Sequence, residues 1–437
     1  MNTKTNNTVI PQLVALATGL NKTDWLSEYR QTHIDALQQS VFPHAGVEHF
    51  KYNRMDAFLD KQFNLAENAT NEQFAINLLK NDSLLSTQVR EQVVFVDGVF
   101  SESLSALGNH QIVTFNKANS TQQAKIVDML SSHRVENNPF IVANACFTGV
   151  NNNAILIEAN QSSPNSIIEI IHINSSRKND TIVNSQVLID IADGCKASVV
   201  NRCLSENDDD SRCNVLSTQH NIINIGKNAS CTYYDLTLPN NNALHFASTC
   251  YNLQSNCQLD SFNTATGSTL NKVDIEVNHL GEHAQANIDG LYVANNQQQV
   301  DYHTTVNHPL PNGKTNENFR GLVNGNAEAT FNGRIHISPD AQKTLAELSN
   351  KNLLLSDDAI LHTKPELEIY ADDVVCAHGA TVSRLNNRSL NYLRARGIAK
   401  QEAEMMLSYA FFDELLEELV HQEIAEYLRP ILFKRFG

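Results

Sequence analysis

The chain has 437 residues, a formal net charge of −16 and a pI near 5.4. This length allows a large core, and the acidic balance argues against a protein that grips nucleic acid through a basic face. No apolar run reaches the roughly 18 residues of a membrane span, and the N-terminus lacks the basic and apolar regions of a signal peptide. We therefore expect a soluble cytoplasmic protein with no membrane or nucleic-acid partner.

Residues 1–135 are expected to be mainly helical. DWLSEYRQTHIDAL (24–37) and TQQAKIVDMLSSH (121–133) both show apolar residues at spacings of three and four. Between them, QVVFVDGVF (92–100) predicts two short strands around Asp97 and Gly98.

Residues 136–385 change to short apolar stretches separated by bends rich in Asn and Gly. Ile191, Ile225, Leu253 and Val277 mark successive units of a degenerate repeat, which Val323 and Ile369 continue. A unit of about two dozen residues must stack on its neighbours to bury a core. The pattern predicts a mainly β protein whose core is a parallel β-helix. An antiparallel sandwich is less favoured, because it should show more Asn-Gly hairpin bends.

Residues 386–437 return to a helical pattern. NNRSLNYLRARG (386–397) predicts a short helix, and residues 400–428 predict a second, longer one. Its apolar stripe consists of Ala403, Met406, Leu407, Ala410 and Phe411. From the pattern alone, this acidic amphipathic helix covers an open coil end of the β-helix or docks a partner, and covering is favoured.

The cysteines are scattered, without a CxxC pair, which argues against a structural zinc or ferredoxin-type site. Most are expected to be buried, reduced thiols; they are Cys146, Cys195, Cys203, Cys213, Cys231, Cys250, Cys257 and Cys376.

DDVVCAHGATVSRL (372–385) places Cys376 and His378 two positions apart in a predicted strand, so the two side chains project from one face. A thiolate and an imidazole are ligands for iron or zinc, but two ligands leave a metal incompletely coordinated. The missing ligands would come from elsewhere, such as a partner chain. The alternative is that both residues are packed or hydrogen-bonded without a functional role.

Three stretches carry a resemblance to the SufD branch of the SufB/SufD family of iron-sulfur cluster assembly proteins. They are NENFRGLVNG (316–325), residues 341–385 and NYLRARGIAKQEAEMMLSYAF (391–411). WLSEYR and FPHAGVEHFKYNRMDAF are similar to the N-terminal region of that family. Residues 48–53 depart there from its usual Glu-Glu-Trp-Arg-Tyr-Thr pattern. The form Cys-Ala-His-Gly at 376–379 favours SufD over SufB.

The resemblance implies a right-handed parallel β-helix between helical regions, and a non-enzymatic scaffold subunit of a SufB-SufC-SufD complex. His378, with Cys376 beside it, would bind a nascent iron-sulfur cluster transiently at the interface with a SufB-like paralogue. The C-terminal region would dock a SufC-like ATPase. This role replaces the covering of the open coil end that the pattern alone favours. The docking candidates are Leu393, Met406, Leu407, Ala410 and Phe411. No tightly bound cofactor is expected in the isolated chain; a flavin in the complex and a homodimer of the isolated chain stay open.

Two other function classes compete with this interpretation: a polysaccharide-active β-helix enzyme and a structural β-helix protein. Asp274 and Glu276 suggest glycoside chemistry, but same-face carboxylates are common on half-exposed strands. His279 and His283 are expected to be surface histidines rather than a metal pair. The run 208–210 of three aspartates is expected to be a solvated loop.

Overall fold

The computed structural model describes residues 8–436 except 59–60, 67–71, 83, 85–88, 107, 109, 134, 136–137, 162–165, 176–179, 206–214 and 240. Cys213 and the aspartate run 208–210 lie outside the described residues. In the described part of the chain, no helix combines the length and apolarity needed to cross a bilayer.

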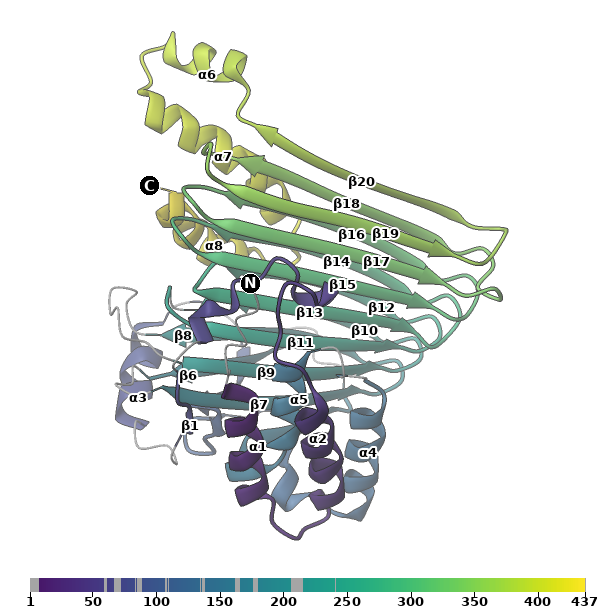
Figure 1. Cartoon of the computed structure of the whole chain (residues 1–437). Helices are drawn as coiled ribbons and strands as arrows, with labels where there is room; N and C mark the ends of the chain where they lie inside the picture. Colours follow the sequence, from purple (N-terminus) through teal and green to yellow (C-terminus); the bar gives the residue numbers. More distant parts are fainter. Residues whose placement is uncertain are drawn as a thin grey trace.

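Two long parallel sheets face each other and form the predicted β-helix, which is thereby confirmed (Figure 1). We call them sheet A and sheet B. Sheet A contains β4 (Gln111–Thr114), β5 (Ala154–Ala159), β7 (Thr181–Ile191), β9 (Val215–Ile225), β11 (Leu244–Leu253), β13 (Leu270–His279), β15 (Gln299–His308), β17 (Glu328–Ile337) and β19 (Ile360–Ile369), with β1 (Asn64–Leu65) paired to β7. Sheet B contains β3 (Val99–Phe100), β2 (Val89–Val96), β6 (Ser166–Asn174), β8 (Lys196–Ser205), β10 (Ser230–Thr237), β12 (Gln258–Thr266), β14 (Gln285–Ala294), β16 (Lys314–Val323), β18 (Leu345–Leu354) and β20 (Val375–Arg384).

From β5 onward, successive strands alternate between the two sheets, so each coil adds one strand to each sheet. The tight bends between them contain Asn228, Asn256, Asn296 and Asn312, all with φ between 56° and 64°. Asparagine tolerates this left-handed conformation better than most residues, which explains the Asn-rich sequence of this region.

Side chains alternate between the interior of the β-helix and its outer faces. The interior holds one continuous apolar cluster that extends along the β-helix from Phe95 in the first coils to Ala371 in the last. Aromatic residues such as Tyr292, Phe319 and Phe331 fill the space between the sheets. The stacked coils bury this core jointly, as the repeat pattern predicts.

The N-terminal helices pack on the first coils, α3 on the outer face of sheet B and the others on the outer face of sheet A. They are α1 (Val9–Leu20), α2 (Ser27–Gln39), α3 (Glu72–Asn81), α4 (Ser120–Ser131) and α5 (Pro139–Cys146), with short 3-10 turns η1 (Glu48–Phe50), η2 (Met55–Phe58), η3 (Phe115–Lys117) and η4 (Val150–Asn152). Phe140 of α5 stacks on Phe246 of β11 with 4.0 Å between ring centroids. The segment with η1 and η2 then crosses sheet A, as Asn53 donates to Asp301 (2.8 Å) on β15.

The C-terminal segment forms α6 (Asn387–Arg394), α7 (Lys400–Glu417) and α8 (Gln422–Phe436). The single helix expected over 400–428 is wrong, because the chain turns back after Glu417. The backbone N–H of His421 donates to Tyr234 Oη (3.1 Å) in this turn. The turn allows α7 and α8 to bury Phe412 and Leu416, among others, on the outer face of sheet B.

These helices therefore cover the side of the β-helix and leave its last coil open. The initial preference for a helix over the open coil end is wrong for the same reason. Strands β19 and β20 end their sheets (Figure 1). Almost every residue of β20 is exposed.

Candidate functional site

The open end of the β-helix contains Cys376 and His378. Both lie on β20, where Cys376 pairs with Ala346 and His378 with Leu348 of β18. Ala346 and Leu348 point into the interior and are buried. Cys376 and His378 share this inward direction, but no further coil of the described chain covers them, so Cys376 is half-buried and His378 is exposed.

Burial is the main reason why the pKa of the Cys376 thiol is raised above its ordinary value. At neutral pH the thiol is therefore protonated in the isolated chain, and it is a weak nucleophile and ligand in this form. A bound cation would favour the thiolate. The structure brings Cys376 and His378 to one accessible edge, as the strand pattern predicts.

Large apolar side chains surround this edge. Val382 points inward like His378, and it is 48% exposed because the next coil is absent. Ile360, Ile369, Tyr370 and Val375 are also exposed at 41–63%. Unpaired strand edges flanked by apolar side chains are a template for pairing with another chain.

The predicted docking residues of the C-terminal region lie in different environments. Leu393, Leu407 and Phe411 are half-buried, whereas Ala403, which belongs to the predicted stripe but not to the docking candidates, is buried. Met406 is 46% exposed, and Ala410 is exposed as well. The predicted apolar stripe only partly coincides with the face of α7 that packs on sheet B. Met406 and Ala410 therefore lie on the outer surface.

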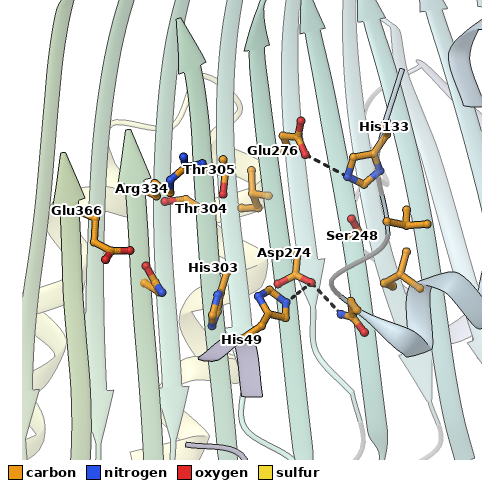
Figure 2. A pocket seen from close by; sticks show the side chains of 15 residues that line it. His49, His133, Ser248, Asp274, Glu276, His303, Thr304, Thr305, Arg334 and Glu366 are labelled. Carbon is orange, nitrogen blue, oxygen red and sulfur yellow. Dashed lines mark hydrogen bonds and ion pairs between the residues drawn. The ribbon is translucent and has the colours of Figure 1, made fainter. Parts of the chain in front are cut away.

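A second group of polar residues lines a cleft of about 240 Å³ on the outer face of sheet A (Figure 2). Asp274 of β13 and His303 of β15 are register partners, and His49 of η1 lies over them. The Nε2 of His49 is 3.2 Å from Asp274 Oδ2, which also accepts from Asn138 (2.8 Å). Sequence spacing gave no signal for this group, because His49 is far from both strands along the chain.

Charged and buried neighbours shift the pKa values of the residues in this group. Lys272, which is fully buried, contacts Asp301 (2.9 Å) and lies 3.8 Å from Asp274 Oδ1. Burial opposes the ionisation of Asp274, but His49 and Lys272 hold its pKa below the ordinary value. Burial, together with Lys272, lowers the pKa of His49, so its ring is neutral at pH 7.

The expectation of surface histidines is wrong for His279. It is buried and stacks on His308 with 4.0 Å between ring centroids, and Thr315 contacts both rings. His283 is exposed in a bend. The cysteine prediction is confirmed for the described residues: six free thiols are buried, and Cys376 is half-buried.

Comparison with known proteins identifies the family. The family described as "SUF system FeS cluster assembly, SufBD core domain" matches residues 172–411. The chain belongs to the SufB/SufD family. This match covers most of the β-helix together with α6 and most of α7. The family acts in the SUF system of iron-sulfur cluster assembly, and its members are components of that assembly system.

Individual relatives agree with this assignment. The chain is 27% identical to the iron-sulfur cluster assembly protein SufD of Escherichia coli over 398 residues, which are 90% of this chain and 89% of that protein. It is 27% identical to SufD of Bacillus subtilis over 65% of this chain and 64% of that protein. A SufBD family protein of Synechocystis, slr0076, is 32% identical over 45% of this chain and 44% of its own length. The resemblance to SufD is confirmed.

Proposed function

We propose that this SufB/SufD family chain is a non-catalytic scaffold subunit that joins a SufB-like paralogue at the open end of its β-helix. Iron and sulfide would assemble at this interface into a transient cluster, which is cargo rather than a resident cofactor. The observation that carries the proposal is the uncovered last coil, where β19 and β20 expose unpaired strand edges.

Edge pairing fits both the backbone and the side chains of this end. A second β-helix with a similar open end could continue both sheets through main-chain hydrogen bonds. It would also bury Val382 and the other exposed apolar residues around the edge. The same edge could pair with a second copy of this chain when the paralogue is absent, so a homodimer is a competing outcome.

Cys376 and His378 supply two ligand types at this junction. Among the described residues, no group of three metal-ligating side chains includes them, and an iron site needs further ligands. A thiolate or imidazole from the paralogue would complete the set. His378 is the stronger candidate because its imidazole is exposed, whereas the Cys376 thiol is half-buried and protonated.

A SufC-like ATPase would dock on the projecting C-terminal helices. α6 lies beyond the end of β20 and packs on α7 rather than on the sheets (Figure 1). Met406 and Ala410 are exposed on α7, with Leu407 beside them. The chain contains no GxxxxGK[ST] motif, so we place nucleotide binding on the ATPase. Movement of the docked ATPase would pull on this end of the β-helix and open the interface to iron and sulfur.

Co-expression with a SufB-like and a SufC-like protein tests this proposal. The expected result is a stable complex of the three chains that gains iron and sulfide, with the SufB-like subunit bound at β20. A chain that forms only homodimers, with neither partner bound, would contradict it.

A further inference from the structure

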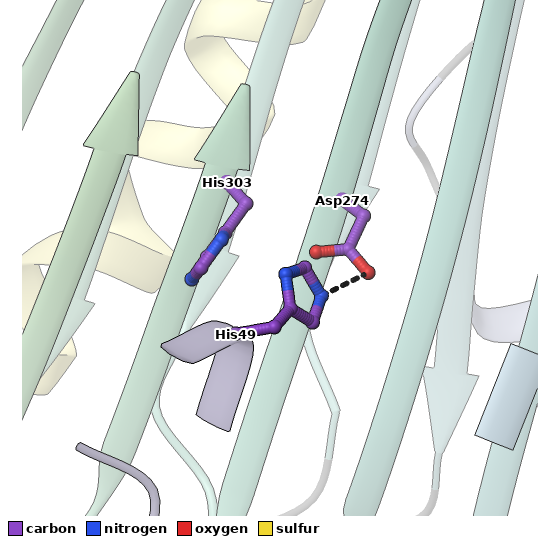
Figure 3. Close-up of side chains that lie close together, drawn as sticks. All are labelled: His49, Asp274 and His303. Atoms are coloured by element: carbon purple, nitrogen blue, oxygen red, sulfur yellow. Dashed lines mark hydrogen bonds and ion pairs between the residues drawn. The ribbon is translucent and has the colours of Figure 1, made fainter. Parts of the chain in front are cut away.

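The cleft on the outer face of sheet A contains a group of metal-ligating side chains that the assembly proposal does not use. We propose that His49, Asp274 and His303 bind one divalent first-row transition-metal ion. The geometry supports this directly, because one ligand atom from each residue lies within 4.8 Å of the other two. Figure 3 shows the three side chains converging from η1, β13 and β15.

Two of the ligands are placed by the sheet itself. Asp274 and His303 are register partners on adjacent parallel strands, where neighbouring strands are about 4.8 Å apart. Both point to the outer face, since the alternating residues Ile275 and Tyr302 belong to the interior cluster. The third ligand, His49, is placed by η1, whose Phe50 is buried beside it.

Each of the three side chains keeps a lone pair that could bind a metal. Asp274 Oδ2 accepts from His49 and Asn138, whereas Oδ1 is buried and has no hydrogen-bond partner among the described residues. With Nε2–H of His49 donating to Asp274, its Nδ1 keeps a lone pair. His303 Nε2 lies 3.0 Å from Asp301 Oδ1, which leaves Nδ1 of His303 as the second nitrogen donor.

A supporting shell fixes the ligands. Asp301 contacts His303 and is itself held by Lys272 (2.9 Å) and Asn53 (2.8 Å). A carboxylate behind a ligating histidine orients the ring and raises its basicity, as at many metal sites. Lys272 repels a cation, but the two carboxylates and the one ammonium leave a net charge of −1. The site can therefore accept a divalent ion.

Two imidazoles and one carboxylate suit Zn²⁺, Fe²⁺ or Co²⁺ better than Mg²⁺ or Ca²⁺, which prefer oxygen ligands. Ligands of one such ion, bound at about 2.0–2.2 Å, lie roughly 3–4 Å apart. Small side-chain rotations would close the present separations. Bound metal would tie the N-terminal segment at η1 to β13 and β15.

Titration of the purified full-length chain with Co²⁺ tests the site, because cobalt with nitrogen and oxygen ligands absorbs visible light. We expect one Co²⁺ per chain with d–d bands and no sulfur charge-transfer band, and a rise in Tm. In the His303→Gln variant, affinity should fall at least tenfold. His49→Gln is a second ligand variant, and His44→Gln, an exposed histidine of the same segment, is the matched control.

Thermal unfolding without metal shows whether each variant folds. If only one of the two ligand variants folds, its Co²⁺ affinity is the one compared with that of the wild type. Equal Co²⁺ affinity of wild type and the ligand variants would overturn the proposal. So would a sulfur charge-transfer band that disappears in Cys376→Ala, since it would place the metal at β20 instead. Neither result would affect the assembly function proposed above.

Discussion

His378 on β20 pairs with Leu348 on β18, and both side chains point into the β-helix, but only Leu348 is buried, at 2% exposure. The difference arises because β20 is the last strand of sheet B. An interior position thus becomes a surface position at the end of the coil stack. Residues that would be core elsewhere are available there to a partner and to metal.

His378 should affect cluster yield rather than stability. Replacing it with alanine should change the free energy of unfolding by no more than about 0.5 kcal/mol, because the side chain is exposed. Cluster yield of the three-chain complex should fall several-fold, measured as iron and acid-labile sulfide per complex. The control is His44→Ala, which removes another exposed imidazole. Unchanged yield in His378→Ala would remove this residue from the mechanism.

Cys376→Ala should reduce cluster yield less than His378→Ala. Burial raises the pKa of this thiol, so it is mostly protonated before the complex forms. The same iron and sulfide assay ranks the two variants. A larger loss in Cys376→Ala would reverse the order and make the thiol the principal ligand.

A charge at the open end should prevent pairing with the SufB-like subunit. Val382→Glu places a carboxylate in an interface that must become dry, so the heterodimer should dissociate in size-exclusion chromatography. Val41→Glu makes the same change at a residue that is 66% exposed in the N-terminal region. If the Val382→Glu variant forms the heterodimer with the same affinity as the Val41→Glu variant, the paralogue binds elsewhere.

Docking of the ATPase should depend on Met406 rather than on the buried face of α7. Met406→Glu should weaken binding of the SufC-like protein, measured by calorimetry, without lowering Tm. Val127→Glu is the control, since Val127 on α4 is 45% exposed and Met406 is 46% exposed. Equal binding by both variants would exclude this surface of α7.

Deleting the whole C-terminal segment is a poor test, because α7 and α8 also contribute to the core. Leu416 is fully buried against sheet B. Leu416→Ala should cost about 2–5 kcal/mol in unfolding free energy, measured with denaturant. A cost below 1 kcal/mol would indicate that α7 is not firmly packed on the sheet.

Glu317, a buried carboxyl group, should make a contribution to stability that is lost as the pH rises from about 5 to 8. Glu317 lies in register with Ile288 and Leu348 and points into the interior. Burial raises its pKa from 4.5 to about 7, although Thr304 opposes the rise. Between pH 4.5 and about 7, the folded state therefore binds more protons than the unfolded state. The free energy of unfolding loses roughly 3 kcal/mol as Glu317 gives up its proton.

Glu317→Gln removes this titration and keeps a similar shape. Urea unfolding at pH 5 and pH 8 should show the loss in the wild type relative to the variant. Parallel pH profiles for the two proteins would contradict an interior, protonated Glu317.

The repeat could be predicted from the sequence in part. Ile191, Ile225 and Leu253 are direct register partners, as the spacing predicts. Val277 is two residues out of register, because it pairs with Tyr251, and Val323 lies in the opposite sheet. Two similar strands in each coil give similar patterns, so composition alone does not separate sheet A from sheet B.

The edge site was accessible to sequence reasoning because Cys376 and His378 are neighbours on one strand. The metal-ligating group was not, since His49 meets Asp274 and His303 only after η1 crosses sheet A. Buried His279 was also mispredicted. Its burial depends on stacking with His308 in the next coil, and this is a tertiary contact that local pattern does not reveal.

Amide hydrogen–deuterium exchange of this chain, alone and with the SufB-like subunit, tests most directly whether the open end of the β-helix is the interface. We expect β19 and β20 to exchange quickly in the isolated monomer and to become protected on binding, while α1 and α2 stay unchanged. Protection of the N-terminal helices with no change at β20 would contradict this expectation.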